Sequence, residues 1–208
     1  MRGERQWSGR DDARYALTTL ALALVTGGFV ALLLRAGAIV LPLAWPSVWT
    51  FAREAMAYVI LFEVYFYGLH RLLHRRVLFA RIHAVHHRSH SPTVLTGLTF
   101  HPVEALLIIA FVPVAMWLMP IHVASLAIVS TFLSGSILLA HSGREPFPPW
   151  WEQVPVLNWY VTPSMHARHH ARGDCNYSAT LSFCDRAFGT WRREPPRPGT
   201  VAGLPSSR

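Results

Sequence analysis

Long runs of apolar residues divide the chain into segments of the length that crosses a membrane. Residues 15–34 contain no charged side chain, and about 20 apolar residues of helix span the hydrocarbon core of a bilayer. Three further apolar runs follow at 50–69, 102–119 and 121–140. The pattern predicts an all-α integral membrane protein with about four transmembrane helices.

Few charged residues interrupt these runs; the exceptions are Arg53, Glu54, Glu63 and Glu104. Residues 36–49 are apolar but contain Pro42 and Pro46, which predicts a loop or a piece that re-enters the membrane. A cleaved signal peptide is the alternative for the first run, because charged residues precede it. The run is long for a signal peptide and no convincing cleavage site precedes Arg35, so we favour a membrane anchor.

Composition and charge support the membrane interpretation. The chain is 52% hydrophobic and 14% charged, whereas about 25% of the residues in soluble domains are charged. The formal net charge is +8, and all 19 basic residues are arginine. These arginines flank the apolar runs, so membrane topology and anionic head groups explain the charge better than nucleic acid does. Cys175 and Cys184 are too few for a disulfide framework, and we expect them to stay reduced.

Four spans place both termini on one side of the membrane. That side carries every arginine except Arg35 and Arg53, so the positive-inside rule makes it cytoplasmic. It also carries every histidine except His122. We therefore expect a cytoplasmic, histidine-rich helical cap on the membrane domain. The expected boundaries are 1–14 for a cytoplasmic N-terminal segment, 15–194 for the membrane-embedded domain and 195–208 for a disordered tail.

Histidines are concentrated in two stretches, and the spacing H-x-x-H-H occurs in both. Residues three and four apart share one face of a helix, so each stretch directs its imidazoles one way. Imidazole binds iron, zinc, copper and nickel, and eight such ligands exceed the needs of one metal. The pattern predicts a site for two metal ions. The residues are His70, His74, His83, His86 and His87 in the first stretch, and His166, His169 and His170 in the second.

Other polar residues lie near these stretches. His141 directly follows the fourth span and is a candidate ninth ligand. Glu145, which comes soon after it, is a candidate ligand or a hydrogen-bond partner of the ligands. Glu63 and Glu104 lie in apolar runs, where an acid is costly and is usually functional or paired. Carboxylates commonly orient metal-binding histidines, and pairing with an arginine is the alternative for both.

Three histidines have weaker assignments. His101 either caps the third span or hydrogen-bonds within the site, and we favour a role in the site. His90 is interpreted as a bystander. His122 is interpreted as an interfacial residue at the opposite end of the spans, with no role in the site.

The segments HRLLH, HAVHH, HPVE, HSGRE and MHARHH occur in this order and are followed by NYSATLSFCDRAFGTW. Over roughly residues 60–192 the chain resembles the fatty acid hydroxylase superfamily, which includes sterol desaturases, sterol C4-methyl oxidases and sphingolipid fatty-acid hydroxylases. The resemblance implies a non-haem di-iron oxygenase of the membrane. It also implies metal-binding roles for the eight histidines of the two stretches and for His141. Where some members carry a further histidine, this chain has Glu145.

The expected reaction is hydroxylation, or desaturation, of a C–H bond in a lipid, fatty-acyl or sterol-like substrate. The resemblance implies O2 as co-substrate and two electrons from a separate cytochrome b5-like or ferredoxin-like donor. We expect two iron ions, which zinc can replace in purified protein because it binds imidazole more tightly than ferrous iron does. We expect a substrate cleft between the spans, lined by Phe62, Tyr65 and Phe66. The expected location is the bacterial inner membrane, with both termini and the metal site cytoplasmic.

Two other classes of protein remain as alternatives. A zinc-dependent membrane hydrolase would need a glutamate base in an H-E-x-x-H arrangement, and no glutamate follows a motif histidine in that way. A bis-histidine haem electron carrier would need ligands on facing helices inside the membrane, whereas these histidines gather at one face of it.

Overall fold

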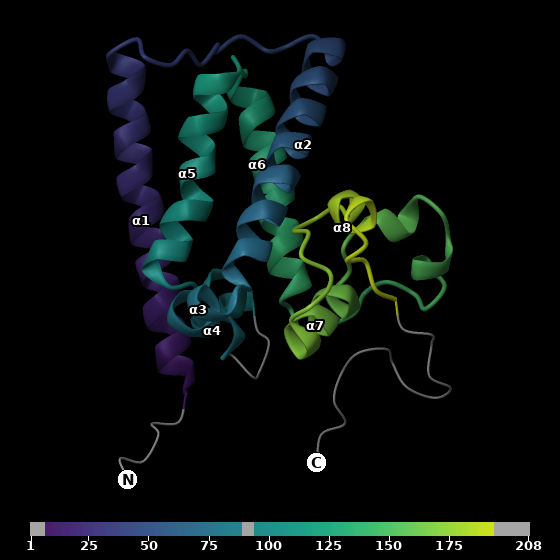
Figure 1. Cartoon of the computed structure of the whole chain (residues 1–208). Coiled ribbons are helices and arrows are strands. Elements are labelled where there is room, and N and C mark those ends of the chain that lie inside the picture. The colour runs from purple at the N-terminus through teal and green to yellow at the C-terminus, as the bar shows by residue number, and fades with distance from the viewer. Residues whose placement is uncertain (1–6, 89–93, 194–208) are drawn as a thin grey trace.

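The computed structural model describes residues 7–88 and 94–193. Within these ranges the chain is helical, and its one β pairing is an isolated bridge between Tyr160 and Leu181. Four long helices form a bundle (Figure 1): α1 (Gly9–Arg35), α2 (Val48–Leu73), α5 (Pro102–Leu118) and α6 (Val123–Ala140). The shorter elements are α3 (Arg76–Leu78), a π-helical turn (Phe79–His83), α4 (Ala84–His87), α7 (Pro163–Arg172), α8 (Phe183–Ala187) and 3₁₀ turns at Val94–Leu98, Trp151–Gln153 and Leu157–Trp159.

Local sequence explains where the first two long helices begin. The Asp11 carboxylate accepts a hydrogen bond of 3.0 Å from the backbone N–H of Ser8, as in a capping box. The first helix therefore begins at Gly9, inside the segment that we expected to precede the membrane domain. The Ser47 hydroxyl starts α2 by accepting a hydrogen bond of 3.1 Å from the backbone N–H of Thr50, which satisfies a donor that the helix leaves free.

Three of the long helices, α1, α2 and α6, have the length and apolar composition to cross a membrane. The helix α5 is also apolar, but its 17 residues make it shorter than the others. The all-helical membrane fold expected from the sequence is confirmed, and the count of four spans stays a prediction. The tail expected at 195–208 lies outside the described residues.

The bundle has two different ends (Figure 1). The beginning of α1 and the short helices α3, α4 and α7 lie at one end. The connection between α1 and α2 and the turn between α5 and α6 lie at the other. At that far end the Val123 backbone N–H donates to the carbonyl of Pro42 at 3.0 Å, which ties the apolar connection at 36–47 to the start of α6.

The apolar core between α2, α5 and α6 contains a cluster of aromatic rings. Phe62 meets the edge of Phe111 with ring centroids 5.2 Å apart, and Tyr65 contacts the same ring at 5.5 Å. Phe62 also contacts Phe66 at 5.6 Å. The side chains that we expected to line a substrate cleft therefore pack against other rings, Phe62 against Phe66 and Tyr65 against Phe111, because such contact buries the large apolar surface of the rings.

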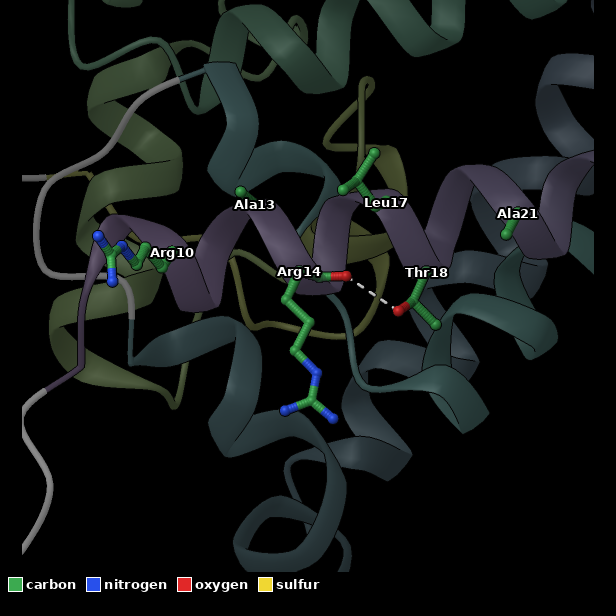
Figure 2. A pocket seen from close by; sticks show the side chains of 6 residues that line it. All are labelled: Arg10, Ala13, Arg14, Leu17, Thr18 and Ala21. Carbon is green, nitrogen blue, oxygen red and sulfur yellow. Dashed lines mark hydrogen bonds between the residues drawn. The ribbon is translucent and has the colours of Figure 1, made fainter.

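Two hollows open on the outside of the bundle. One, with a volume of about 780 Å³, lies between α2 and α6 and is lined by apolar side chains that include Val59, Phe132 and Leu181. The other runs along α1 (Figure 2) and is lined by Arg10, Ala13, Arg14, Leu17, Thr18 and Ala21. Its two arginines lie one turn apart near the start of α1, at the end of the bundle where the short helices lie. This position suits the polar boundary of a membrane.

Candidate metal centre

Nine histidines, all predicted from the sequence as metal ligands, meet at one end of the bundle. They come from the end of α2, the segment 79–87, the end of α6 and the short helix α7. That helix begins where the Thr162 hydroxyl accepts a hydrogen bond of 3.2 Å from the backbone N–H of Met165. It ends at Gly173, whose φ of +72° is left-handed, a conformation that favours glycine. Both ends of the helix that carries three of the ligands are thus defined.

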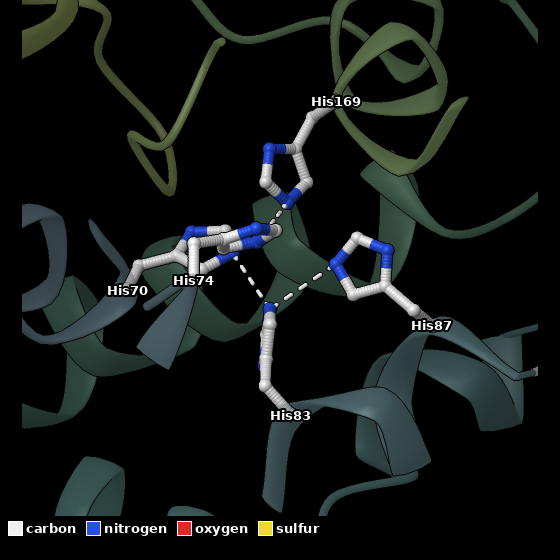
Figure 3. A group of neighbouring side chains, drawn as sticks. All are labelled: His70, His74, His83, His87 and His169. Carbon is white, nitrogen blue, oxygen red and sulfur yellow. Dashed lines mark hydrogen bonds between the residues drawn. The ribbon is translucent and has the colours of Figure 1, made fainter. Parts of the chain in front are cut away.

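The first group contains His70, His74, His83, His87 and His169 (Figure 3). Nε2 of His83 lies 3.1 Å from Nε2 of His70 and 3.1 Å from Nε2 of His87. Nε2 of His74 lies 3.2 Å from Nε2 of His169. One ligand atom from each of the five residues lies within 4.8 Å of all the others, so the five rings surround a common centre.

The second group contains His86, His141, His166 and His170, and its ligand atoms also lie within 4.8 Å of one another. Nε2 of His141 lies 3.1 Å from Nε2 of His86 and 2.8 Å from Nε2 of His166. Nε2 of His170 lies 3.0 Å from Nε2 of His166. The two groups adjoin, because the ring centroids of His87 and His170 are 4.4 Å apart.

Each H-x-x-H-H motif serves both groups. His83 and His87 join the first group, whereas His86 between them joins the second. In α7 the assignment is reversed: His166 and His170 join the second group and His169 joins the first. We expected each motif to direct its imidazoles one way, and this is wrong, because the histidines three apart join different groups. Residues four apart lie on one helix face, whereas neighbouring residues point about 100° apart. Each motif thereby links the two groups through a single rigid turn.

Hydrogen bonds at Nδ1 fix the tautomer of five ligands. A carbonyl oxygen can only accept, so an imidazole nitrogen bonded to it carries the proton and leaves Nε2 free to bind a metal. The Nδ1 atoms of four histidines donate to carbonyls: His70 to Tyr177 at 2.7 Å, His86 to Thr99 at 3.3 Å, His141 to Ile137 at 2.7 Å and His169 to Cys175 at 2.8 Å. An ionised carboxylate likewise only accepts, and in that form the Glu104 carboxylate, 2.7 Å away, accepts from Nδ1 of His83.

These tautomers make the donor set fit metal ions. In His70 and His83, Nδ1 carries the proton, so two bare Nε2 lone pairs face each other at 3.1 Å. The same holds for His86 and His141, also at 3.1 Å. Such pairs repel unless a cation lies between them. Nitrogens that bind one metal at about 2.1 Å and at a right angle to each other stand about 3 Å apart, so the arrangement suits bound metal.

Burial keeps the imidazoles neutral. Desolvation lowers the pKa of His74, His87 and His141 to about 4. Desolvation, with the neighbouring histidines, lowers the pKa of the remaining ligands outside the spans well below the ordinary value; the clearest cases are His86, His166, His169 and His170. Neutral imidazole is the form that binds metal, so these residues are in their ligand form at neutral pH.

The predicted acidic partners have three different positions. Glu104 accepts from Nδ1 of His83 and is buried with it. Glu145 accepts hydrogen bonds from the backbone N–H of Ser164 at 2.9 Å and of Phe147 at 3.0 Å, so it supports the first turn of α7. Glu63 accepts from the backbone of the segment 179–181. Neither Glu63 nor Glu145 belongs to a ligand group.

The remaining histidines lie apart from the two groups or outside the described residues. His101 caps α5, where Nδ1 accepts a hydrogen bond of 3.2 Å from the backbone N–H of Val103; this is the capping role, not the role in the site that we favoured. His122 lies at the far end of the bundle and bonds the Glu54 carboxylate at 2.7 Å. His90 lies outside the described residues.

Four groups that support the ligands were not assigned from the sequence. They are the backbone carbonyls of Thr99, Ile137, Cys175 and Tyr177. Backbone atoms leave no composition signal in the sequence.

Comparison with known proteins identifies relatives of the chain. The sequence model of the family described as fatty acid hydroxylase matches residues 55–190, which include all nine ligands. The chain is 29% identical over 164 residues to ornithine lipid hydroxylase OlsE of Rhizobium tropici, covering 76% of this chain and 47% of that protein.

Two further relatives have other activities in their names. The chain is 30% identical over 155 residues to methylsterol monooxygenase 1 of Gallus gallus, covering 72% of this chain and 51% of that protein. It is 32% identical over 146 residues to very-long-chain aldehyde decarbonylase GL1-1 of Oryza sativa subsp. indica, covering 67% of this chain and 23% of that protein. The chain thus spans about half the length, or less, of these relatives. No solved structure matches it.

Proposed function

Because the chain belongs to the fatty acid hydroxylase family, we propose that this integral membrane protein is a non-haem di-iron oxygenase. The proposed reaction is hydroxylation of a C–H bond in a lipid, fatty-acyl or sterol-like substrate with O2 and two electrons. Hydroxylation is preferred to desaturation because one relative is named a hydroxylase and another a monooxygenase.

The observation that carries the proposal is the convergence of nine imidazoles in two groups, with Nδ1 of five of them engaged outward. His70, His74, His83, His87 and His169 would hold one metal, and His86, His141, His166 and His170 the other. Iron bound there would supply the activation of dioxygen.

The chain itself orients and shields this centre. Glu104 holds the Nδ1 proton of His83 and directs Nε2 inward. His83 and His169 are 1% and 0% exposed, whereas His74 and His87 are half-buried, so bulk water is kept from one side of the first group. Exclusion of water protects reactive chemistry from side reactions.

The substrate and partners follow from the setting. A centre at the end of apolar helices lies close to the bilayer, which favours a membrane lipid as substrate. We further propose a cytochrome b5-like or ferredoxin-like protein as electron donor. In the proposed orientation, in the bacterial inner membrane, the end of the bundle that carries the histidines faces the cytoplasm, where such donors occur.

The test combines metal and lipid analysis. The purified full chain, loaded anaerobically with ferrous iron, should hold two irons by elemental analysis and show nitrogen-ligated iron by Mössbauer spectroscopy. Mass spectrometry should find a lipid with one added oxygen in cells that express the wild type and not in cells that express His169→Ala.

The other outcomes separate the alternatives. A lipid that has lost two hydrogens identifies desaturation. A Soret absorption band in the purified chain indicates a haem carrier, and lipid cleavage that depends on zinc indicates a hydrolase. Either of the last two results overturns the proposal, as does a chain that binds no metal.

A further inference from the structure

The segment between α7 and α8 forms a bracket beside the first histidine group. The carbonyl of Cys175 accepts from Nδ1 of His169 at 2.8 Å, and the carbonyl of Tyr177 accepts from Nδ1 of His70 at 2.7 Å. Asn176 between them has a φ of +55°, a left-handed conformation that asparagine tolerates better than most residues. Two ligands from different helices are thus oriented by carbonyls on either side of one unusual residue.

Glu63 holds one part of this segment. It is fully buried on α2, two helical turns before His70. Its carboxylate accepts from the backbone N–H groups of Thr180 at 2.7 Å, Leu181 at 3.0 Å and Ala179 at 3.2 Å. Both oxygens accept, as the two oxygens of an ionised carboxylate do.

Asp185 at the start of α8 holds the other part. It is 1% exposed. One of its oxygens accepts from the backbone N–H of Tyr177 at 2.8 Å and from the Thr190 hydroxyl at 2.7 Å. The other accepts from the backbone N–H of Ser178 at 2.9 Å. The peptide unit between Tyr177 and Ser178 accepts from His70 through its carbonyl and donates to Asp185 through its N–H. Asp185 therefore holds the group that orients His70.

Together the two carboxylates accept hydrogen bonds from the five consecutive backbone N–H groups of residues 177–181. Among the hydrogen bonds of the described residues, neither carboxylate meets a histidine nitrogen. Charge-assisted hydrogen bonds of this kind are about twice as strong as neutral ones. The backbone is consequently fixed at the point where it orients His70 and, through Asn176, His169.

We propose that Glu63 and Asp185 are positioning residues for the metal of the first histidine group. They lock the segment 175–181 so that its carbonyls hold the Nδ1 protons of His70 and His169 and aim both Nε2 atoms at the metal. Two buried negative charges near the centre also offset the charge of bound cations. The inference rests on the proposed function only in requiring that the two groups bind metal.

The test uses the full chain loaded with isotopically enriched ferrous iron. Glu63→Gln and Asp185→Asn keep the shapes of the side chains but turn one acceptor into a donor that faces backbone N–H groups. Each variant should hold about one iron per chain in place of two, with the Mössbauer signal of the second group kept. Metal affinity of the first group should fall about 10- to 100-fold, as for other groups that orient ligands.

Glu54→Gln is the matched control. Glu54 is a buried carboxylate on the same helix and accepts a hydrogen bond of 3.2 Å from the backbone N–H of His122, but at the far end of the bundle. This variant should lower the unfolding temperature and leave two irons with an unchanged spectrum. Glu63→Asp, which keeps the charge on a shorter side chain, should give an intermediate iron content.

The outcomes decide the proposal. Two irons and a wild-type spectrum in both Glu63→Gln and Asp185→Asn would overturn it. If neither of these variants nor Glu63→Asp folds while Glu54→Gln does, the carboxylates serve the fold and not the metal, which also overturns it. A wild type that binds two metals but oxidises no lipid would refute the proposed function and leave this inference intact.

Discussion

The Glu104 carboxylate accepts a hydrogen bond of 2.7 Å from Nδ1 of His83, and the two side chains are 2% and 1% exposed. The bond joins α5 to the segment that carries three ligands, and it leaves Nε2 of His83 directed at the first group. Both side chains are shielded from water, so the pair is well placed to control how strongly His83 binds a metal.

Replacing Glu104 by glutamine tests this control. The amide oxygen can still accept from Nδ1, but the negative charge that raises the basicity of the imidazole is gone. We expect the first metal to bind about 10- to 100-fold more weakly. Competition with a chelator, followed by elemental analysis, measures the change. If the first metal binds the variant as tightly as it binds the wild type, the prediction is wrong.

His169 and His170 are neighbours in α7 but belong to different groups. We therefore expect His169→Ala to remove the metal of the first group and His170→Ala to remove that of the second. Each variant should hold about one iron, and the two Mössbauer spectra should be complementary. Identical spectra from the two variants would show that the division into groups is incorrect.

His122→Ala should keep both metals and full activity, because His122 lies at the far end of the bundle. Its loss leaves the buried Glu54 without the 2.7 Å hydrogen bond, and an unsatisfied buried polar group costs about 1–3 kcal/mol. Thermal unfolding in detergent should show this lower stability. A loss of metal in this variant would contradict the placement of His122 at the end of the bundle opposite the histidine groups.

Replacing Glu145 by alanine distinguishes a role in supporting α7 from a role as a metal ligand. Its carboxylate accepts from the backbone N–H of Ser164 at 2.9 Å, in the first turn of α7. We expect Glu145→Ala to lower the free energy of unfolding by roughly 0.5–2 kcal/mol, the usual value of a helix cap, and to retain two metals. A chain that loses one metal on this change would instead identify Glu145 as a ligand.

Gly97 packs directly against a ligand. A Cβ added at this position would stand 3.3 Å from Nδ1 of His141 and 3.2 Å from Cδ2 of Leu138. We expect Gly97→Ala to displace the His141 ring and to weaken metal binding in the second group, with an overpacking cost of about 1–3 kcal/mol. Gly135→Ala is the control, since nothing lies within 4 Å of its added Cβ; metal titration of the two variants should differ.

The sequence was sufficient to identify the helical membrane fold and the nine residues that converge. Apolar run length is a local property and reports the long helices directly, and the H-x-x-H-H spacing reports which imidazoles share a helix face. Helix ends were less predictable. The first helix begins at Gly9, ahead of the apolar run that starts at residue 15, because a capping box at Ser8 and Asp11 extends it through polar residues.

The tertiary structure alone decided how the nine ligands divide and what supports them. His86 and His87 are adjacent in sequence, yet they face different groups, because the assignment depends on which helices lie opposite each face. The roles of Glu63 and Glu104 diverged for the same reason: one meets backbone N–H groups distant in sequence, and the other meets His83. The spacing of residues determines which side chains share a face, but only the packing of helices determines what that face meets.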